Sequence, residues 1–205
     1  MFIVKLSVSP TVLFKATENK TTMKNLLLIA FILLSGIVFA QNSANVTVGD
    51  QALPFSGKTV EGNNIQLEDL YKNNPVVFVM LRGWPGYQCP ICTKQVGGLV
   101  EDAEKFQNAG ATVLMVYPGP SEELVEHANE FSEDFTFPSH FYFILDPDYS
   151  ITNLYGLRWD APNETAYPST FIVNKNGEIV FAEVSSSHGG RAENDEILRV
   201  LNQLK

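Results

Sequence analysis

Residues 84–95 read Trp-Pro-Gly-Tyr-Gln-Cys-Pro-Ile-Cys-Thr-Lys-Gln and contain the only two cysteines of the 205-residue chain, Cys89 and Cys92. A run of strand-forming residues, 76–81, precedes this stretch, and apolar residues recur at roughly helical spacing from Ile91 to about residue 108. The cysteines are therefore expected where a buried strand turns into a helix. The free amides and the dipole at a helix start stabilise a thiolate, so this position predicts a reactive thiol.

The proline between the two cysteines predicts where this helix begins. Pro90 suits the first helical position, because its missing N–H costs no hydrogen bond there. Cys89 then becomes the N-cap residue and Cys92 lies in the first turn. The sulfur of Cys89 can accept a hydrogen bond from the amide of Cys92.

A Cys-X-X-Cys pair is compatible with redox, metal-binding and structural roles. A zinc site needs about four ligands, and the sequence offers no second cysteine pair and no closely spaced histidines. The three histidines, His127, His140 and His188, are scattered and are expected to be exposed or hydrogen-bonded. A structural disulfide closing so short a loop would constrain the unfolded chain little. The pattern therefore favours a redox pair that needs no metal and no cofactor, and the other two roles stay open.

The first forty residues differ from the rest of the chain. Met23 and Lys24 precede an apolar stretch of about 14 residues that ends at Ala40, which is the layout of a secretory signal peptide. That stretch is shorter than the roughly 20 residues that span a bilayer comfortably. We interpret residues 1–22 as an upstream extension, 23–40 as a signal peptide and 41–205 as one domain. The protein is expected to be exported, to the periplasm or outside the cell, and to meet a membrane only through the cleaved signal peptide.

Loss of this leader makes the protein more acidic. The chain carries a net charge of −9, and residues 1–40 contribute four lysines and one glutamate, so the remainder carries −12. A surface of this charge repels nucleic acid and anionic lipid, and neither is expected as a partner.

The remaining sequence alternates strand and helix patterns. Residues 61–64 predict a turn between two short strands, and residues 68–72 a helical turn. Ser121 is expected to cap a helix that reaches about Phe131, after a break at residues 118–120. Strands are predicted at 111–117, 141–145, 169–173 and 178–182, and further helices at 150–155 and 192–204. This order is typical of a parallel α/β unit.

Taken together, these elements resemble the thioredoxin fold, at two distant motifs. One is the Cys-Pro-Ile-Cys sequence, and the other is Tyr-Pro-Ser-Thr-Phe at residues 167–171. In that fold the motif proline is cis, and the backbone before it lies beside the cysteines and pairs with extended substrate. The resemblance gives this role to Pro168 and places Tyr167 beside it. It also implies an α/β thioredoxin-like fold, with a central mixed sheet flanked by helices and an N-terminal β extension.

Within this fold the chain is similar to the peroxiredoxin-like superfamily of alkyl hydroperoxide reductases and thiol-specific antioxidants. The likeness covers about residues 46–204 and includes residues 48–55, residues 67–70 and the Arg-Ala-Glu sequence at 191–193. It implies a thiol-dependent oxidoreductase, whose substrate is a peroxide or a disulfide and whose partner is a reducing thiol.

The overlay on this superfamily also shows departures. It puts Cys92 at the peroxidatic position, Pro85 at the motif proline, and Cys89 where a threonine stands. Pro168 occupies the place of an activating arginine. Arg82 or Arg158 could replace that arginine, although an exposed position is expected for both.

Two mechanisms remain open. In disulfide exchange, Cys89 attacks a partner disulfide and Cys92 resolves the mixed disulfide. In peroxide reduction, Cys92 becomes a sulfenic acid and Cys89 condenses with it. Both mechanisms end in a Cys89–Cys92 disulfide. Trp84 and Pro85 are expected at the rim of the site, together with Tyr87.

Two alternatives belong to other functional classes. One is a copper-binding protein that uses Cys89, Cys92 and His188. The other is an adaptor with a thioredoxin-like fold and no catalytic activity.

Overall fold

The computed structural model describes residues 44–205, so the predicted upstream extension and signal peptide lie outside the described residues. The strands are β1 (Ser56–Lys58), β2 (Asn64–Gln66), β3 (Val76–Met80), β4 (Thr112–Gly119), β5 (Phe141–Pro147), β6 (Ser169–Val173) and β7 (Ile179–Val184). The helices are α2 (Leu67–Tyr71), α3 (Pro90–Glu101), α4 (Ala103–Asn108), α5 (Leu124–Ser132), α6 (Ser150–Leu154) and α7 (Asn194–Gln203). Within this part of the chain, no helix is long and apolar enough to cross a membrane.

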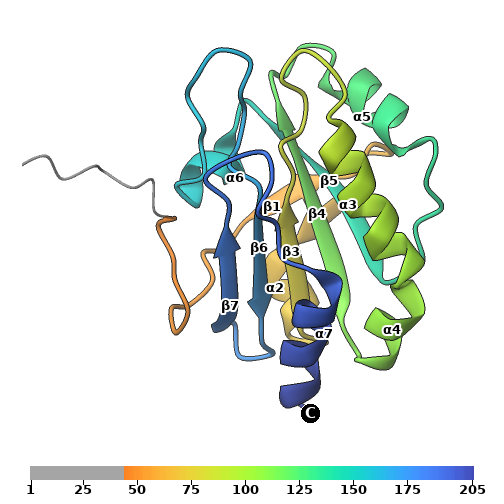
Figure 1. Ribbon diagram of the computed structural model, residues 1–205, viewed down its shortest axis with the longest axis vertical. Coiled ribbons are helices and arrows are strands. Elements are labelled where there is room, and N and C mark those ends of the chain that lie inside the picture. Colours follow the sequence, from red (N-terminus) through yellow and green to blue (C-terminus); the bar gives the residue numbers. More distant parts are fainter. Residues whose placement is uncertain (1–43) are drawn as a thin grey trace, which may run out of the picture. The chain divides into compact units, whose positions relative to one another are not determined.

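One mixed sheet organises the described domain (Figure 1). Its strand order is β2-β1-β5-β4-β3-β6-β7. The three central strands β3, β4 and β5 are parallel, while β6 and β7 continue the sheet in antiparallel pairing on one side. The hairpin of β1 and β2 extends the other side, where β1 runs antiparallel to β5. The predicted α/β class, mixed sheet and N-terminal β extension are confirmed.

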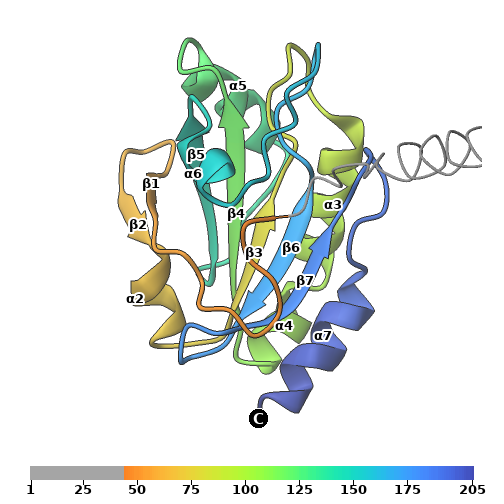
Figure 2. The ribbon, with the colours of Figure 1, turned by 90° about the vertical axis from the view of Figure 1, so that its left-hand side faces the viewer.

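Helices cover both faces of the sheet. Figures 1 and 2 show α3, α4 and α7 on one face and α2 and α6 on the other, and α5 packs into the same core as α3. The side chains of β3 alternate between the two cores, with Val77 and Val79 on the α3 side and Phe78 and Met80 on the α2 side. Because this strand is buried on both faces, it appears in the sequence as an unbroken apolar run.

Two predicted helix boundaries are wrong, and distant contacts explain both. The helix expected from Ile91 to about residue 108 divides at Asp102, where the side chain of Asn194 donates to the carbonyl of Gly98 and to the Asp102 carboxylate. Ser121 is not an N-cap, because its amide is held by the Asp148 carboxylate at 3.0 Å. The N-cap is instead Glu123, and helix α5 begins at Leu124, two residues later than predicted.

The predicted break at residues 118–120 is also misplaced. Strand β4 continues through Gly119 because β5 extends to Pro147 and remains paired with it.

Gly83 carries the chain from β3 into the loop that holds the cysteines. Its φ angle is +68°, a left-handed conformation that L side chains rarely adopt. A Cβ atom at this position would also collide with the backbone oxygen of Pro118 on β4. The amide of the next residue, Trp84, donates to that same oxygen at 2.9 Å. A side chain at residue 83 would therefore push the cysteine loop away from the sheet.

Gly83→Ala should destabilise the protein more than Gly62→Ala, which serves as the matched control. Gly62 has φ +89° with no atom near the added Cβ, so its substitution costs only the backbone strain, about 1–2 kcal/mol. The collision with Pro118 should add about 1–3 kcal/mol at residue 83. Urea unfolding of both variants measures the difference, and equal losses would show that β4 does not constrain the loop.

Candidate active site

The cysteines lie where the sequence predicts, at the start of α3. Cys89 is the N-cap residue with extended backbone, and Pro90 takes the first helical position. The amide of Cys92 donates to the sulfur of Cys89 at 3.3 Å. Both residues are free thiols, and the exposed fraction is 3% for Cys89 and 0% for Cys92. The predicted N-cap geometry is confirmed, and it gives the two sulfurs different surroundings.

These surroundings lower the pKa of one cysteine and raise the pKa of the other. A hydrogen bond from the Cys92 thiol lowers the pKa of Cys89 to about 6, against the effect of burial and with help from the Cys92 amide, Arg191 and Arg82. Burial, together with the neighbouring Cys89, raises the pKa of Cys92 well above the usual value of a thiol. At neutral pH the pair therefore holds its negative charge on Cys89 and its proton on Cys92.

Arg191 is a site residue that the sequence analysis did not select. It lies half-buried in the segment between β7 and α7, and its Nη2 is 3.4 Å from the sulfur of Cys92. Its other nitrogens donate to the side chain of Gln95 and to the carbonyl of His188. Within residues 44–205 no carboxylate forms an ion pair with Arg191, so its charge acts on the sulfurs without a counterion.

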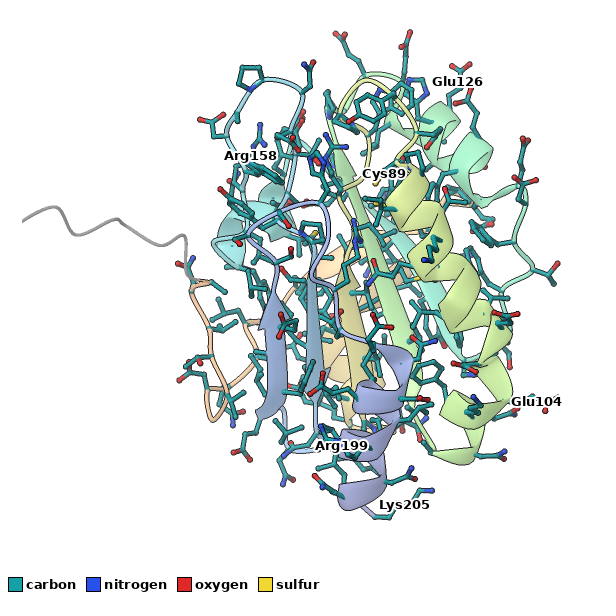
Figure 3. The ribbon with its side chains drawn as sticks, viewed as in Figure 1. Cys89, Glu104, Glu126, Arg158, Arg199 and Lys205 are labelled. Atoms are coloured by element: carbon teal, nitrogen blue, oxygen red, sulfur yellow. The ribbon has the colours of Figure 1, made fainter. Side chains whose placement is uncertain are left out.

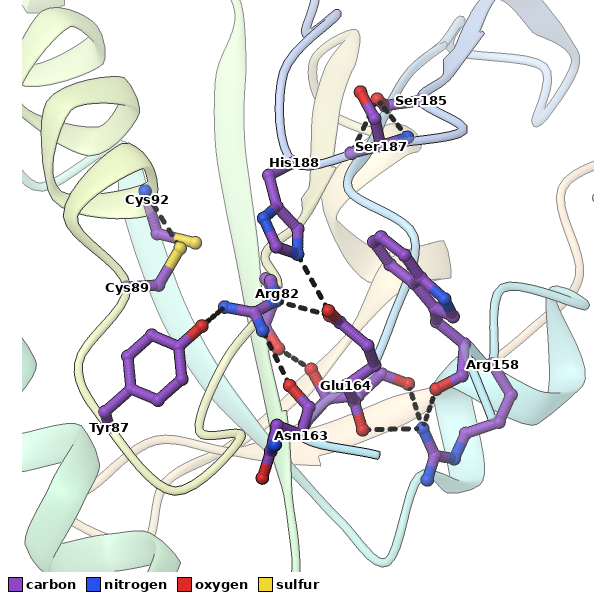
Figure 4. Close-up of polar contacts among 12 residues, drawn as sticks. Arg82, Tyr87, Cys89, Cys92, Arg158, Asn163, Glu164, Ser185, Ser187 and His188 are labelled. Carbon is purple, nitrogen blue, oxygen red and sulfur yellow. Dashed lines mark hydrogen bonds and ion pairs between the residues drawn. The ribbon is translucent and has the colours of Figure 1, made fainter. Parts of the chain in front are cut away.

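Arg82 is buried, and the expectation that it is exposed is wrong. Its Nε donates to Glu164 at 2.6 Å, and its two other nitrogens donate to the Tyr87 hydroxyl and the Asn163 carbonyl, as Figure 4 shows. Only 2% of the residue is exposed. A guanidinium can be buried in this way because each nitrogen has an acceptor and the carboxylate balances its charge.

Arg158, the other candidate, is only partly exposed. It donates to the carbonyls of Trp159 and Glu164, and its guanidinium lies over the ring of Tyr149, 4.0 Å from its centroid. In Figure 4 it lies on the far side of Glu164 from the cysteines. Arg158 therefore organises the loop rather than replacing the missing arginine.

Glu164 joins two of the site's side chains. Its carboxylate binds Arg82 through Oε2 and the His188 ring nitrogen Nε2 through Oε1, at 2.8 Å (Figure 4). Burial would raise the pKa of Glu164, but hydrogen bonds from Arg82 and His188 outweigh that effect and keep the pKa below its usual value. Glu164 is thus an ionised acceptor for both partners. No local pattern points to it, because it stands in an irregular segment 82 residues after Arg82.

The predicted rim residues have distinct positions. Trp84 is half-buried and stacks on the ring of His127, with centroids 3.5 Å apart. Pro85 is half-buried beside it, in the turn that leads to Tyr87. Tyr87 is 45% exposed and its hydroxyl is fixed by Arg82. The stacking of Trp84 fixes the base of the loop, while Tyr87 faces solvent near Cys89.

Pro168 and Tyr167 lie at the start of β6. Residue 169 pairs with Met80, so Pro168 is at the sheet end from which the cysteine loop begins. Pro168 is buried but is not cis, since no cis peptide bond occurs between residues 44 and 205. Two backbone hydrogen bonds hold the chain here: the Tyr167 amide donates to the carbonyl of Leu157, and the Ser185 amide donates to the carbonyl of Pro168. The resemblance to the thioredoxin fold predicted a cis peptide bond before Pro168, and this prediction is wrong.

The histidines have separate surroundings. His127 contacts Glu130, His140 contacts the carbonyl of Ala103, and His188 contacts Glu164. In the described part of the chain, no three His, Cys, Asp or Glu side chains are grouped closely enough to hold a metal ion. Cys89, Cys92 and His188 thus do not form a preassembled copper site.

Comparison with known proteins identifies the family. The model of the AhpC/TSA family matches residues 48–182. The chain belongs to this family. It is 29% identical over 162 residues to a chloroplastic peroxiredoxin Q of Sedum lineare, which covers 79% of this chain and 81% of that protein. It is 27% identical over 146 residues to a putative peroxiredoxin of Mycobacterium tuberculosis, covering 69% and 87%.

Solved structures show the same fold. Peroxidoxin BcpB of Mycobacterium tuberculosis aligns with a TM-score of 0.61 at 17% identity, covering 78% of this chain and 99% of that one. A yeast mitochondrial 1-Cys peroxiredoxin aligns with a TM-score of 0.63 at 17% identity, covering 78% and 76%. As a member of the AhpC/TSA family with this fold, the protein is a thiol-dependent oxidoreductase of the peroxiredoxin type.

The division of charge between the cysteines predicts how they react with an alkylating agent. In the reduced protein, iodoacetamide should modify Cys89 first, at a rate that rises with pH to a midpoint of about 6. Arg191→Gln should raise this midpoint by up to about one pH unit, because an uncompensated cation is lost. Mass spectrometry of the modified peptide gives the site and the rate.

Arg199→Gln is the matched control for that experiment. It removes the same charge from an exposed position on α7, which Figure 3 shows far from Cys89. Its midpoint should equal that of the unmodified protein. If both thiols titrate at about pH 8.5, as free cysteine does, the helix start does not activate either of them.

Proposed function

We propose that the protein reduces hydroperoxides, with Cys89 as the attacking thiolate and Cys92 as the resolving thiol. A reducing thiol partner then reopens the Cys89–Cys92 disulfide. The observation that carries this proposal is the hydrogen bond from the Cys92 amide to the Cys89 sulfur, which stabilises negative charge on Cys89.

The roles differ from those that the family overlay implies. The overlay assigns peroxide attack to Cys92, but that residue is fully buried and burial raises its pKa. Cys89 is more accessible and has the lower pKa. Since the thiolate is the reactive form, these surroundings favour attack by Cys89.

The catalytic steps require only the two sulfurs and a proton source. The Cys89 thiolate attacks the terminal oxygen of the hydroperoxide, the O–O bond breaks, and the departing oxygen leaves as an alcohol or water after taking up a proton. Cys89 is now a sulfenic acid. The Cys92 thiol attacks its sulfur, the S–O bond breaks, and water leaves as the disulfide forms.

Arg191 supports this chemistry in place of the arginine that Pro168 replaces. Its unpaired charge is 3.4 Å from the sulfur of Cys92 and lowers the pKa of Cys89. A cation held in position stabilises both the thiolate and the negative charge that develops on the departing oxygen. Arg82 contributes less, because Glu164 already balances its charge.

The partner that reduces the disulfide is proposed to be a thioredoxin-like protein or a small thiol. In the yeast mitochondrial 1-Cys peroxiredoxin, the thiol is resolved via glutathione and thioredoxin systems. In the present chain, two exposed apolar side chains flank Cys89 in sequence, Tyr87 at 45% and Ile91 at 42%. They offer a flat contact for a protein that must reach the disulfide.

Disulfide exchange is the second candidate function. A thiolate at a helix N-cap in a Cys-Pro-Ile-Cys sequence can also attack a disulfide, with the same two residues in the same roles. The two functions differ in substrate preference. Stopped-flow rates of the reduced protein with hydrogen peroxide and with a small disulfide separate them.

Single cysteine variants test the assigned roles. Cys92→Ser should react with one equivalent of peroxide and hold a sulfenic acid at Cys89, which dimedone traps. Cys89→Ser should lose the fast phase, with a rate reduced about 100-fold or more, because the remaining thiol is buried and protonated. Trapping of sulfenic acid at Cys92 in Cys89→Ser, at the rate of the unmodified protein, would reverse the roles.

We also propose that the protein is exported, on the basis of the sequence at residues 23–40. In a Gram-negative host, the full chain should give a periplasmic product that begins at Gln41. Leu33→Arg interrupts the apolar stretch and should leave the precursor uncleaved, whereas Leu33→Val should be processed normally. Intact mass of the periplasmic and cytoplasmic fractions gives the result, and an uncleaved chain in the cytoplasm for both variants would contradict export.

A further inference from the structure

His188 is the one imidazole placed next to the site's charged groups in the described domain. Its ring lies between Glu164 and the cysteines in Figure 4, with Nε2 on the Glu164 side and Nδ1 facing the sulfurs. Its backbone carbonyl accepts from Arg191 Nε at 3.2 Å, and the same guanidinium contacts the Cys92 sulfur. The histidine and the cysteines are thus linked through one arginine.

The carboxylate of Glu164 determines which ring nitrogen of His188 can exchange a proton. Glu164 is ionised and already accepts from Arg82, so it can only accept from His188 as well. The proton in the 2.8 Å contact must therefore reside on Nε2. This leaves Nδ1 as the nitrogen that takes up or releases a proton, on the side of the sulfurs.

The surrounding structure holds the ring in this orientation. The loop that carries His188 is anchored by Ser185, which is 4% exposed and whose hydroxyl donates to the carbonyl of Ser187. The centroid of the Trp159 ring lies 5.2 Å from that of the His188 ring. A carboxylate that fixes the tautomer and orientation of a histidine is a recurrent arrangement in nucleophilic catalysis.

The proposed peroxide chemistry needs a proton that the other groups do not supply. The two guanidinium groups do not lose a proton near neutral pH. The Cys92 proton is required for the later resolving step. His188 is the remaining side chain of this network with a nitrogen, Nδ1, that can both accept and donate a proton.

We propose that His188, oriented by Glu164, is the general acid of the reaction. The proposal rests on peroxide reduction by Cys89. Nδ1 takes up a proton from water, and the Cys89 thiolate attacks the terminal peroxide oxygen. The S–O bond forms as the O–O bond breaks, and Nδ1 gives its proton to the departing oxygen. The thiolate becomes a sulfenic acid, the hydroperoxide becomes an alcohol or water, and His188 ends as it began.

Two oxidants with different leaving groups test this role. Hydrogen peroxide expels a strongly basic oxygen that needs protonation, whereas peracetic acid expels acetate, which does not. His188→Gln should slow sulfenic acid formation with hydrogen peroxide by about 100-fold. The rate with peracetic acid should stay within about threefold, which also shows that the variant is folded. If His188→Gln reacts more slowly with both oxidants by the same factor, His188 has a structural role and the assignment as general acid is overturned.

His140→Gln is the control, because His140 contacts the carbonyl of Ala103 on α4 and the neighbouring ring of Phe141, away from the cysteines. Its rates with both oxidants should be unchanged. Added imidazole should restore the hydrogen peroxide rate of His188→Ala but not that of Cys89→Ser. Glu164→Gln should show the same selective loss as His188→Gln, in a weaker form, since the amide no longer fixes the tautomer.

The role of His188 and the proposed function fail in different ways. If the unmodified protein forms no sulfenic acid at Cys89 with hydrogen peroxide, the proposed function is wrong. If it does so and His188→Gln reacts equally fast with hydrogen peroxide, only the role of His188 is wrong.

Discussion

The site depends on the hydrogen bond between the amide of Cys92 and the sulfur of Cys89. This bond exists only if α3 begins at Pro90 directly after the loop that leaves β3. Strand β3 is buried on both faces, and Gly83 lets the loop turn against β4 without a side chain. The reactivity of the thiol is therefore a property of one of the central strands, β3, and of one tight backbone contact, as much as of the cysteine itself.

The two arginines near the sulfurs have different roles, because a carboxylate neutralises the charge of Arg82 and none of those described neutralises the charge of Arg191. Arg82 and Glu164 form a nearly buried pair, which leaves little net field once desolvation is counted. Their contribution is geometric, because the pair fixes Tyr87, the Asn163 backbone and His188 in one network. Arg191 has no such counterion in the described structure. It contacts the sulfur of Cys92, and its charge lowers the pKa of Cys89 through the electrostatic attraction between the two groups.

Sequence reasoning succeeded where structure is set by neighbours in the chain. The N-cap position of Cys89 follows from Pro90, and the central strands follow from apolar runs. It failed where distant residues decide the outcome. Arg82 looked exposed because Glu164 is 82 residues away, and Arg191 reaches Cys92 across 99 residues. The helix start expected at Ser121 was displaced by a hydrogen bond to Asp148 on another loop. No local pattern carries such information.

The same interactions that lower the pKa of Cys89 also bear on the proposed Cys89–Cys92 disulfide. The helix amide and Arg191 stabilise a charged sulfur, and a disulfide carries no such charge. These contacts therefore stabilise the reduced form relative to the oxidised form, as in dithiol proteins whose disulfides are readily reduced. A thiol with a low pKa is also a good leaving group when a partner attacks the neighbouring sulfur. One electrostatic feature thus favours both of the proposed steps, attack of Cys89 on the peroxide and reduction of the Cys89–Cys92 disulfide by a thiol partner.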